Sequence, residues 1–410
     1  MINSQFAKLL TSELNRIDSA HVSKRLETVI EGFSGHKAII NGKKHLIFNS
    51  NDYLGLRLHP QLKKAEHRAS QKFGTGPGAV RFISGSLKIH RDLEAALARF
   101  HGREEGLVIS SAFAANLAVL TSVVRGPGQE TLICSPVLVV SDELNHRSIV
   151  DGVRLAQVPS ENKAIYRHLD YSHLDEILAA NSKKFSRALV ITDGVFSMLG
   201  QVADLAFIRA IIDKHQSKYS QGILFIVDDC HGVGVMGKTG RGTQEVTNGE
   251  ADILVGTLGK ALGADGGYVV ADKIFIDYLR EAAATYVYSN SISPGTAGAA
   301  LSAIRILSSR EGINLITKSR RNTEFFKSLM IKAGFVFAAD SIHPIQPILI
   351  GNPEKTQTLT RKLLQAGILV TPISYPVVPR GRDEIRVQIS ASHTKNDIGI
   401  FVKTITNLNK

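Results

Sequence analysis

The stretch "ADILVGTLGKALGADGGY", residues 251–268, decides the fold that we predict for this chain. Its first part is a short apolar run, β-branched in places and followed by glycines, which predicts a buried strand. Lys260 then comes just past the carboxyl end of that strand, where open α/β sheets keep their ligands. A lysine is ordinarily a solvated surface charge, and this alternative stays open on these residues alone.

Short apolar runs of the same kind recur through the middle of the chain, at 106–110, 188–193, 223–229 and 252–257. Amphipathic helical patterns such as "ADLAFIRAIIDKH" (203–215) separate several of them. Buried strands that alternate with such helices are typical of a parallel sheet covered on both faces. We therefore predict an α/β fold with a mostly parallel central sheet.

The pattern changes after "SNSISPGTAGAAL" to long helices, three short strands and a final helix from about residue 395. A chain of 410 residues exceeds the size at which one hydrophobic core usually stops growing. We expect a large domain over 51–295, a smaller α+β domain over 296–410, and an N-terminal segment, 1–50, that packs with the small domain. That segment begins with an amphipathic helix, not a signal peptide.

The composition is that of an ordinary soluble protein, with 43% hydrophobic and 21% charged residues and no apolar run long enough for a membrane span. Cys134 and Cys230 match no metal-ligand spacing, so we expect no metal and a reducing, cytoplasmic setting. The net charge of +12 could indicate nucleic acid or a membrane surface, but the basic residues are scattered. A polyanionic small molecule such as coenzyme A explains the excess equally well.

Three further segments hold residues that could do chemistry. "IVDDCHGVG" (226–234) ends an apolar strand in two carboxylates and a histidine, so we expect one buried acid to have a positive partner, either a metal or a protonated heteroaromatic nitrogen. "SSAFAANLAVL" (110–120) opens a helix with small residues, which lets backbone N–H groups meet a phosphate, although a plain helix start is the alternative. His146 alone is more often a structural or surface histidine.

These features together match the needs of pyridoxal 5′-phosphate. A lysine after one strand, an aspartate at the end of another, a helix N-terminus and a histidine supply a Schiff base, a pyridinium partner, a phosphate site and support for the ring. The glycines around Lys260 admit both the cofactor and the backbone at close range. We therefore predict pyridoxal phosphate as the cofactor.

The chain resembles the α-oxoamine synthases, pyridoxal-phosphate enzymes of fold type I that condense an amino acid with an acyl-CoA. The match runs from "FNSNDYLGLRLHP" (48–60) to "IRVQISASHT" (385–394). Stretches such as "TDGVFSM" and "SYPVVPRGRDEIRVQIS" are most similar to the glycine C-acetyltransferase branch, also called 2-amino-3-ketobutyrate CoA ligase. The resemblance implies a transferase that makes 2-amino-3-oxobutanoate from glycine and acetyl-CoA in threonine degradation.

The resemblance also implies roles around the cofactor ring. Lys260 is the Schiff-base lysine and the base that takes a proton from the substrate's α-carbon. Asp228 pairs with the pyridinium nitrogen, while His231 and Ser197 hydrogen-bond near the phenolic oxygen. His146 stacks on the ring.

For the phosphate, the resemblance implies backbone N–H groups of Ala112 and Phe113, the hydroxyl of Thr257, and Ser289 from a neighbouring subunit. The last assignment implies a homodimer with shared active sites. In the substrate site, Arg386 clamps the amino-acid carboxylate in a fork geometry that lysine cannot reproduce, and Asn51 lines the site. Metal, nucleic acid and membrane have no part in this scheme.

One feature of the strand end constrains this scheme. Alternation along a strand places Asp228 with Cys230 on one face and Asp229 with His231 on the other. The scheme uses Asp228 and His231 together. We therefore predict that the strand ends near Asp229 and that the chain turns before His231.

The chain also departs from the acetyltransferase pattern. "GKALGADGGY" is one residue shorter than "GKALGGASGGY", Ala112 and Ala114 replace a cysteine and an aspartate, and Pro77 enters a glycine-rich loop. These differences concern the acyl group, so synthesis of 8-amino-7-oxononanoate, 5-aminolevulinate, 3-ketosphinganine or a secondary metabolite, mostly with decarboxylation, stays as an alternative. Other classes are a pyridoxal-phosphate lyase such as threonine aldolase, and a nucleic-acid or scaffold protein.

Overall fold

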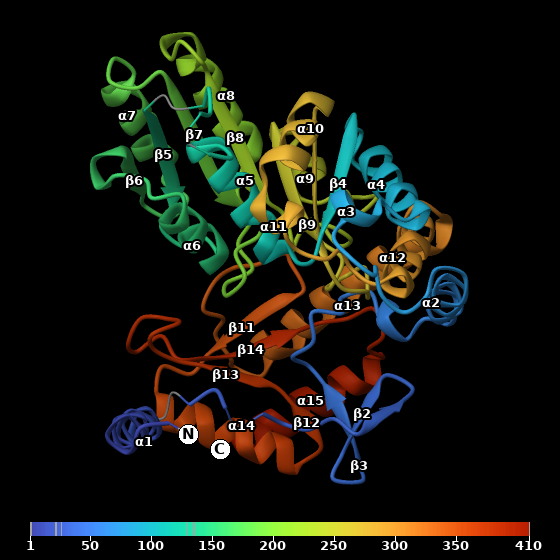
Figure 1. The fold of residues 1–410 in the computed structure, drawn as a ribbon. Helices are drawn as coiled ribbons and strands as arrows, with labels where there is room; N and C mark the ends of the chain where they lie inside the picture. The colour runs from blue at the N-terminus through green and yellow to red at the C-terminus, as the bar shows by residue number, and fades with distance from the viewer. Residues whose placement is uncertain (1, 21–22, 26, 129, 134–135, 410) are drawn as a thin grey trace.

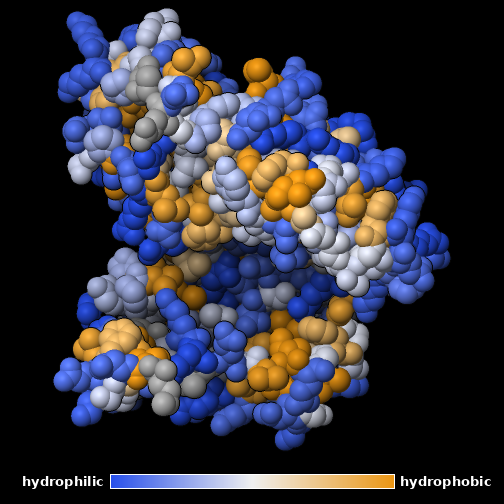
Figure 2. Space-filling view, in the orientation of Figure 1, coloured by the Kyte–Doolittle hydropathy of each residue, from blue (hydrophilic) through white to orange (hydrophobic). Residues whose placement is uncertain are grey.

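A computed structural model describes residues 2–20, 23–25, 27–128, 130–133 and 136–409 of the chain. Figure 1 shows two bodies, one built on a large sheet and one that combines the N-terminal strands with the C-terminal strands and helices. Figure 2 shows a hollow between them, with hydrophilic residues at its depth. The predicted strand that precedes Lys260 belongs to the large sheet.

The large sheet has seven strands in the order β4-β10-β9-β8-β7-β5-β6. Their bounds are β4 Glu105–Ile109, β10 Gly267–Ala271, β9 Ile253–Thr257, β8 Ile223–Asp228, β7 Arg187–Asp193, β5 Val137–Asp142 and β6 Lys163–Tyr166. Only β10 is antiparallel to its neighbours; the other pairings are parallel. The predicted α/β fold with a mostly parallel sheet is therefore confirmed.

Helices cover both faces of this sheet because its strands alternate their side chains between two cores. Val190 of β7 packs into a core with helices on one face, whereas its neighbours Leu189 and Ile191 pack on the other. The first core takes α4 (Lys88–His101), α7 (Tyr171–Asn181), α8 (Leu205–His215) and α12 (Pro294–Leu307). The second takes α5 (Ala112–Arg125), α6 (Arg147–Leu155) and α10 (Lys273–Ala282).

The second body contains two small sheets. One has the order β11-β14-β13, with β11 Ile345–Leu349, β13 Thr371–Ile373 and β14 Glu384–Gln388. The other has the order β1-β2-β3-β12, with β1 Gly32–Ser34, β2 Lys37–Ile40, β3 Lys43–Ile47 and β12 Ile368–Leu369. The apolar run 367–373 is thus split between two sheets, and β12 pairs in parallel with β3 from the start of the chain.

Three helices pack on these small sheets: α13 (Arg310–Lys332), α14 (Pro353–Gln365) and α15 (Lys395–Leu408). Helix α2 (Pro60–Phe73) packs on α12. Shorter elements are α3 (Arg81–Ser84), α9 (Thr243–Thr247), α11 (Ala284–Val287) and 3-10 turns at Leu56–Leu58, Ser160–Asn162 and Gln216–Lys218. The expected final helix is therefore present as α15. The division into domains at residues 50 and 295 stays a prediction.

The first helix, α1 (Ser4–Ser19), forms as its amphipathic pattern predicts. It buries none of its residues in this single chain, and Phe6 and Leu9 are 53% and 63% exposed. Within the described ranges, the helices are all too short or too polar to pass through a bilayer.

A buried carboxylate joins three elements at one edge of the large sheet. Glu94 of α4 is fully buried and accepts hydrogen bonds from Arg81 Nη1 (2.7 Å), Arg280 Nη2 (3.0 Å) and the Val108 backbone N–H (3.0 Å). Burial opposes ionisation of this carboxyl, but the two guanidiniums outweigh burial and lower the pKa of Glu94. The group therefore remains a charged link between α3, α4 and α10.

We expect Glu94→Gln to lower the free energy of unfolding by about 3–5 kcal/mol, because it leaves buried guanidinium charge without its partner. Urea unfolding measures this change. The control is Asp92→Asn on the same helix, which removes an exposed pair with Lys88 (2.7 Å) and should cost under about 0.5 kcal/mol. Equal losses of unfolding free energy in the two variants would show that the buried ion pairs of Glu94 stabilise the fold no more than an exposed pair does.

Candidate active site

A cavity of about 220 Å³ lies where β7, β8 and β9 end and where α5 and α6 begin. Its lining consists of Ala112, Phe113, His146, Ser148, Asp193, Val195, Asp228, Cys230, His231, Thr257 and Lys260. Seven of the residues that the sequence predicts for a cofactor site are therefore brought together here. They come from four segments spread over 149 positions of the chain, from 112 to 260 inclusive.

The end of β8 is what brings Asp228 and His231 to the same cavity. The strand ends at Asp228, and the carboxylate of Asp229 turns away to accept from the Thr243 hydroxyl (2.6 Å) and backbone N–H (2.7 Å). The chain then turns tightly, since a Cβ at Gly232 would lie 2.0 Å from Asp229 Oδ1. The predicted end of the strand before His231 is therefore confirmed.

Asp228 is held by neutral donors. Its carboxylate accepts from Asn116 Nδ2 (2.6 Å) and from the Cys230 backbone N–H (3.0 Å), and the residue is 6% exposed. Over the described ranges, no side chain forms an ion pair with this carboxylate. A buried, oriented carboxylate whose protein partners are all neutral suits a ligand that brings its own positive charge, such as a protonated ring nitrogen.

The start of α5 provides the site for an anion. Ser111 caps the helix by accepting from the Ala114 N–H (3.1 Å), while the N–H groups of Ala112 and Phe113 make no hydrogen bond within the described part of the chain. The adjacent strand β10 comes very near, because a Cβ at Gly267 would lie 2.2 Å from the Ala112 nitrogen. Free N–H groups and the positive end of a helix favour a phosphate.

Lys260 lies in the bend that follows β9, as the sequence predicts. Its backbone oxygen accepts from the Gly263 N–H (3.0 Å), and the side chain is half-buried at the cavity. Its Nζ has no hydrogen bond or ion pair with any residue that the structure describes. A lysine amine, an oriented carboxylate and free helix N–H groups in one cavity fit pyridoxal phosphate in chemistry and in placement.

Three other predicted residues, Ser197, Arg386 and Asn51, do not line the cavity but form hydrogen bonds beside it. Arg386 of β14 donates through Nε to the Ser197 backbone oxygen (2.7 Å). The hydroxyl of Tyr53 lies 3.0 Å from Asn51 Oδ1 and 2.8 Å from His231 Nδ1. The small sheet thus meets the large body at Ser197, and the loop that follows β3 meets it at His231.

Burial sets the protonation of the two cavity histidines. It lowers the pKa of His231 well below its usual value, and the charges of Lys260 and Arg386 add to this effect. Burial also lowers the pKa of His146, with a partial offset from Asp228. Both imidazoles are therefore neutral near pH 7.

The sequence analysis missed Asp193, Asn116 and Tyr53. Asp193 ends β7 directly beside Asp228 in the sheet, and its carboxylate accepts from the His146 N–H (3.3 Å). Burial and the neighbouring Asp228 raise the pKa of Asp193 well above its usual value. The strand-end pattern that pointed to Asp228 is also present in "ALVITD", so this residue could have been found.

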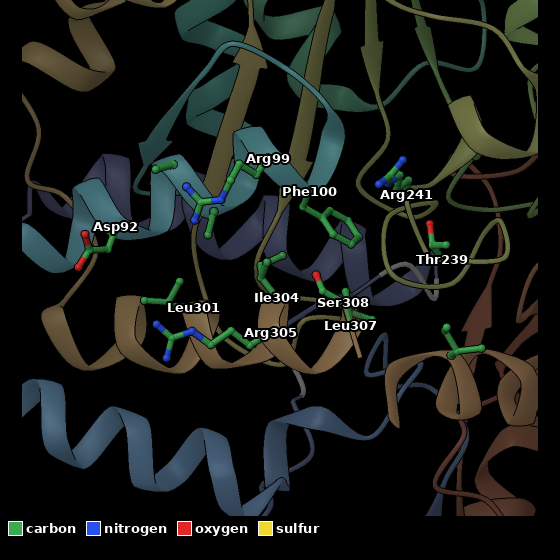
Figure 3. A pocket seen from close by; sticks show the side chains of 13 residues that line it. Asp92, Arg99, Phe100, Thr239, Arg241, Leu301, Ile304, Arg305, Leu307 and Ser308 are labelled. Atoms are coloured by element: carbon green, nitrogen blue, oxygen red, sulfur yellow. The ribbon is translucent and has the colours of Figure 1, made fainter. Parts of the chain in front are cut away.

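Some predicted features lie elsewhere. Ser289 does not line the cavity of its own chain, so its role toward a neighbouring subunit stays a prediction, and Cys134 lies outside the described residues. Within those residues, no group of three histidine, cysteine or acidic side chains could hold a metal. A larger cavity, of about 710 Å³, lies between α4 and α12; Figure 3 shows Arg99, Arg305 and Arg241 spread along it, and it contains none of the predicted residues.

The buried carboxylate of Asp229 makes stability depend on pH. Burial raises its pKa to about 7, against the hydrogen bonds from Thr243, which lower it. The folded state therefore holds this proton more tightly than the unfolded chain, whose aspartates titrate near ~4. The stabilising contribution of this group is full below about pH 4 and is lost as the pH rises through about 7.

We expect Asp229→Asn to remove this loss, because the amide keeps an oxygen and a nitrogen for Thr243 but does not ionise. The free energy of unfolding of the variant, relative to the unsubstituted chain, should rise by a few kcal/mol (on the order of 2–4) between pH 4 and pH 8. Urea unfolding at the two pH values measures this difference. A difference that is constant with pH would contradict a raised pKa for this carboxyl.

Comparisons with known proteins agree on one family. A sequence profile described as aminotransferase class I and II matches residues 43–405. The 8-amino-7-oxononanoate synthases of Treponema denticola and Petrotoga mobilis are 37% and 38% identical to the chain; the alignments cover 100% and 99% of it and 99% and 98% of those proteins. The structure of Sphingomonas wittichii serine palmitoyltransferase is similar with a TM-score of 0.87 at 26% identity, over 98% of this chain and 97% of that one.

The same comparisons correct one prediction. Several relatives that match nearly the whole chain are named 8-amino-7-oxononanoate synthases, which contradicts the expected glycine C-acetyltransferase with acetyl-CoA, glycine and threonine degradation. The physical reason is that these motifs lie in or beside the cavity that fits the cofactor, and the cofactor chemistry is the same for every acyl group. The second serine palmitoyltransferase structure, from S. paucimobilis with bound PLP and myriocin, has a TM-score of 0.85 at 27% identity over 98% and 97% of the two chains.

Proposed function

Because this chain belongs to the aminotransferase class I and II family, within its pyridoxal-phosphate-dependent α-oxoamine synthases of fold type I, we propose that it forms 8-amino-7-oxononanoate. The single observation that carries the specific product is the shared name of relatives that match it over nearly their whole length. The fit of the cavity to pyridoxal phosphate supports the reaction type.

The product's structure defines the substrates. It is a nine-carbon acid with a ketone at C7 and an amine at C8. Division of the C7–C8 bond leaves an amine-bearing carbon with one methyl group, which is alanine without its carboxylate, and a seven-carbon diacid acyl group. The balanced reaction is therefore L-alanine plus a pimeloyl thioester giving 8-amino-7-oxononanoate, carbon dioxide and the free thiol.

Each group of residues in the cavity would have a different role toward the cofactor. Pyridoxal phosphate, when bound, supplies an electron sink that lets the carbon beside the amine carry negative charge. Lys260 would attach the cofactor and move the proton of that carbon. Asp228, oriented by Asn116 and the Cys230 N–H, would keep the ring nitrogen protonated. The free N–H groups at the start of α5 would bind the phosphate.

The residues linked to the cavity would hold the amino acid. Arg386 is 8% exposed and fixed through Nε to the Ser197 carbonyl, so its remaining N–H groups can meet a carboxylate in a planar fork. Asn51 would line the same site. His146 would cover the ring, and Ser197 and His231 would meet its phenolic side.

We also propose a homodimer in which Ser289 of a second copy completes the phosphate site. In the single chain, Tyr288 beside Ser289 is 77% exposed, and its ring lies 6.3 Å from that of Phe82 on α3, which is 65% exposed; Ile83, next to Phe82, is 69% exposed. Exposed apolar clusters of this kind mark association surfaces. A cytoplasmic location stays a prediction.

The test of the product is a panel of acyl thioesters on the purified holoenzyme with glycine, L-serine and L-alanine, in which free thiol and carbon dioxide are followed together. We expect turnover with L-alanine and pimeloyl-CoA, with equal amounts of thiol and carbon dioxide. Thiol release from acetyl-CoA with glycine, and none with the pimeloyl donor, would overturn the proposal.

For the lysine, we expect Lys260→Ala to abolish turnover, a loss of at least about 10⁴-fold, because both cofactor attachment and proton transfer go through its amine. The control is Lys273→Ala, an exposed lysine paired with Asp277 on α10, which should keep full activity. Circular dichroism checks that both variants fold. Substantial condensation by the folded Lys260→Ala protein would remove this residue from its role.

A further inference from the structure

The roles above leave out one fully buried polar side chain at the junction of the two bodies. Tyr53 belongs to "NDYLG" (51–55), in the loop that follows β3, and has an exposure of 0%. Its hydroxyl contacts His231 from the large sheet and Asn51 from its own segment. The positive charge of Arg386, from the small sheet, also acts on this hydroxyl and partly offsets the rise that burial causes in the pKa of Tyr53.

Counting the protons available to these hydrogen bonds shows which ring nitrogen of neutral His231 carries its proton. Asn51 Oδ1 can only accept, so the Tyr53 hydroxyl must be the donor of the bond between them. The hydroxyl has one proton, which it donates to Asn51 Oδ1 at 3.0 Å. His231 Nδ1, at 2.8 Å from the same oxygen, must then be the donor of its bond. A neutral His231 with its proton on Nδ1 leaves Nε2 as an acceptor for the cavity.

The backbone of His231 is held by a second buried histidine. His343 Nε2 donates to the His231 carbonyl (2.8 Å), while its Nδ1 accepts from the Ile345 N–H (3.1 Å), so its own protonation is also fixed. The ring of Tyr53 meets His343 edge to face, with ring centroids 5.0 Å apart. Tyr53 therefore constrains His231 both at its side chain and, through His343, near its backbone.

We propose that Tyr53 is a positioning residue that holds His231 as the Nδ1–H tautomer and ties it to Asn51 of the substrate site. The inference rests on the proposed function for the roles of His231 and Asn51. Its consequence is that one hydroxyl connects the phenolic side of the cofactor with a residue that lines the substrate site. Loss of the hydroxyl should therefore change both the tautomer of His231 and the binding of the amino acid.

The direct test needs no substrate. Nitrogen-15 NMR of histidine-labelled protein without cofactor reports which ring nitrogen of His231 carries the proton, with the signal assigned by its absence in His231→Gln. We expect the Nδ1–H form in the unsubstituted chain and a shift toward Nε2–H in Tyr53→Phe. A His231 that carries its proton on Nε2 in the unsubstituted chain would overturn the proposal, even if the variant failed to fold.

The chain offers a matched control in Tyr268→Phe. Tyr268 is also fully buried, and its hydroxyl is bonded to a histidine, His101 Nε2, at 2.9 Å. In the holoenzyme, Tyr53→Phe should raise the dissociation constant of L-alanine, read from cofactor absorbance, by about tenfold and shift the pH at which that absorbance changes. Tyr268→Phe should do neither.

Equal spectra, pH profiles and alanine affinities in the two variants would show that Tyr53 acts only by packing, and would reject the proposal. Failure of the proposed function has a different signature. In that case the unsubstituted holoenzyme makes no product from L-alanine and pimeloyl-CoA, while the tautomer of His231 in the cofactor-free protein is unaffected.

Discussion

The hydrogen bonds between Asp229 and Thr243 are the constraint on which the site depends. A strand that continued past Asp228 would send Asp228 and His231 to opposite faces of the sheet. By turning its carboxylate away to Thr243, Asp229 ends the strand and allows the chain to fold back at Gly232. The raised pKa of Asp229 shows that these hydrogen bonds require the burial of a carboxyl group, which opposes its ionisation.

The ligand that the cavity can bind is determined by which of its side chains lack a charged partner. Among the described residues, the Asp228 carboxylate accepts hydrogen bonds from an amide and a backbone N–H, and the Lys260 amine has no partner. Both cavity histidines are neutral. A cofactor with a cationic ring nitrogen, an aldehyde and a phosphate brings the complementary group for each. Beside the cavity, Arg386 of the small sheet donates to the Ser197 carbonyl, so residues from different sheets meet there.

Much of this arrangement could be predicted from local sequence. Apolar runs of strand length, helices between them and polar residues at strand ends were enough for the sheet, for Lys260 and for Asp228. The split of 367–373 between two sheets could not be, because its division depends on pairing with β3, which lies more than 300 residues away. Tyr53 gave no signal, since a buried tyrosine looks like core. The acyl group was wrongly predicted because cofactor motifs carry no information on it.

The parallel pairing of β3 with β12 has a consequence for how the chain is made. Ribosomes release about 5–20 residues per second, so the edge of β3 waits roughly 15 seconds to a minute for its partner. All seven strands of the large sheet emerge in that interval and can fold as a unit. The three-stranded meander β1–β3 meanwhile keeps an unpaired edge, and the apolar Leu46 and Ile47 lack the side chains that cover them in the finished fold.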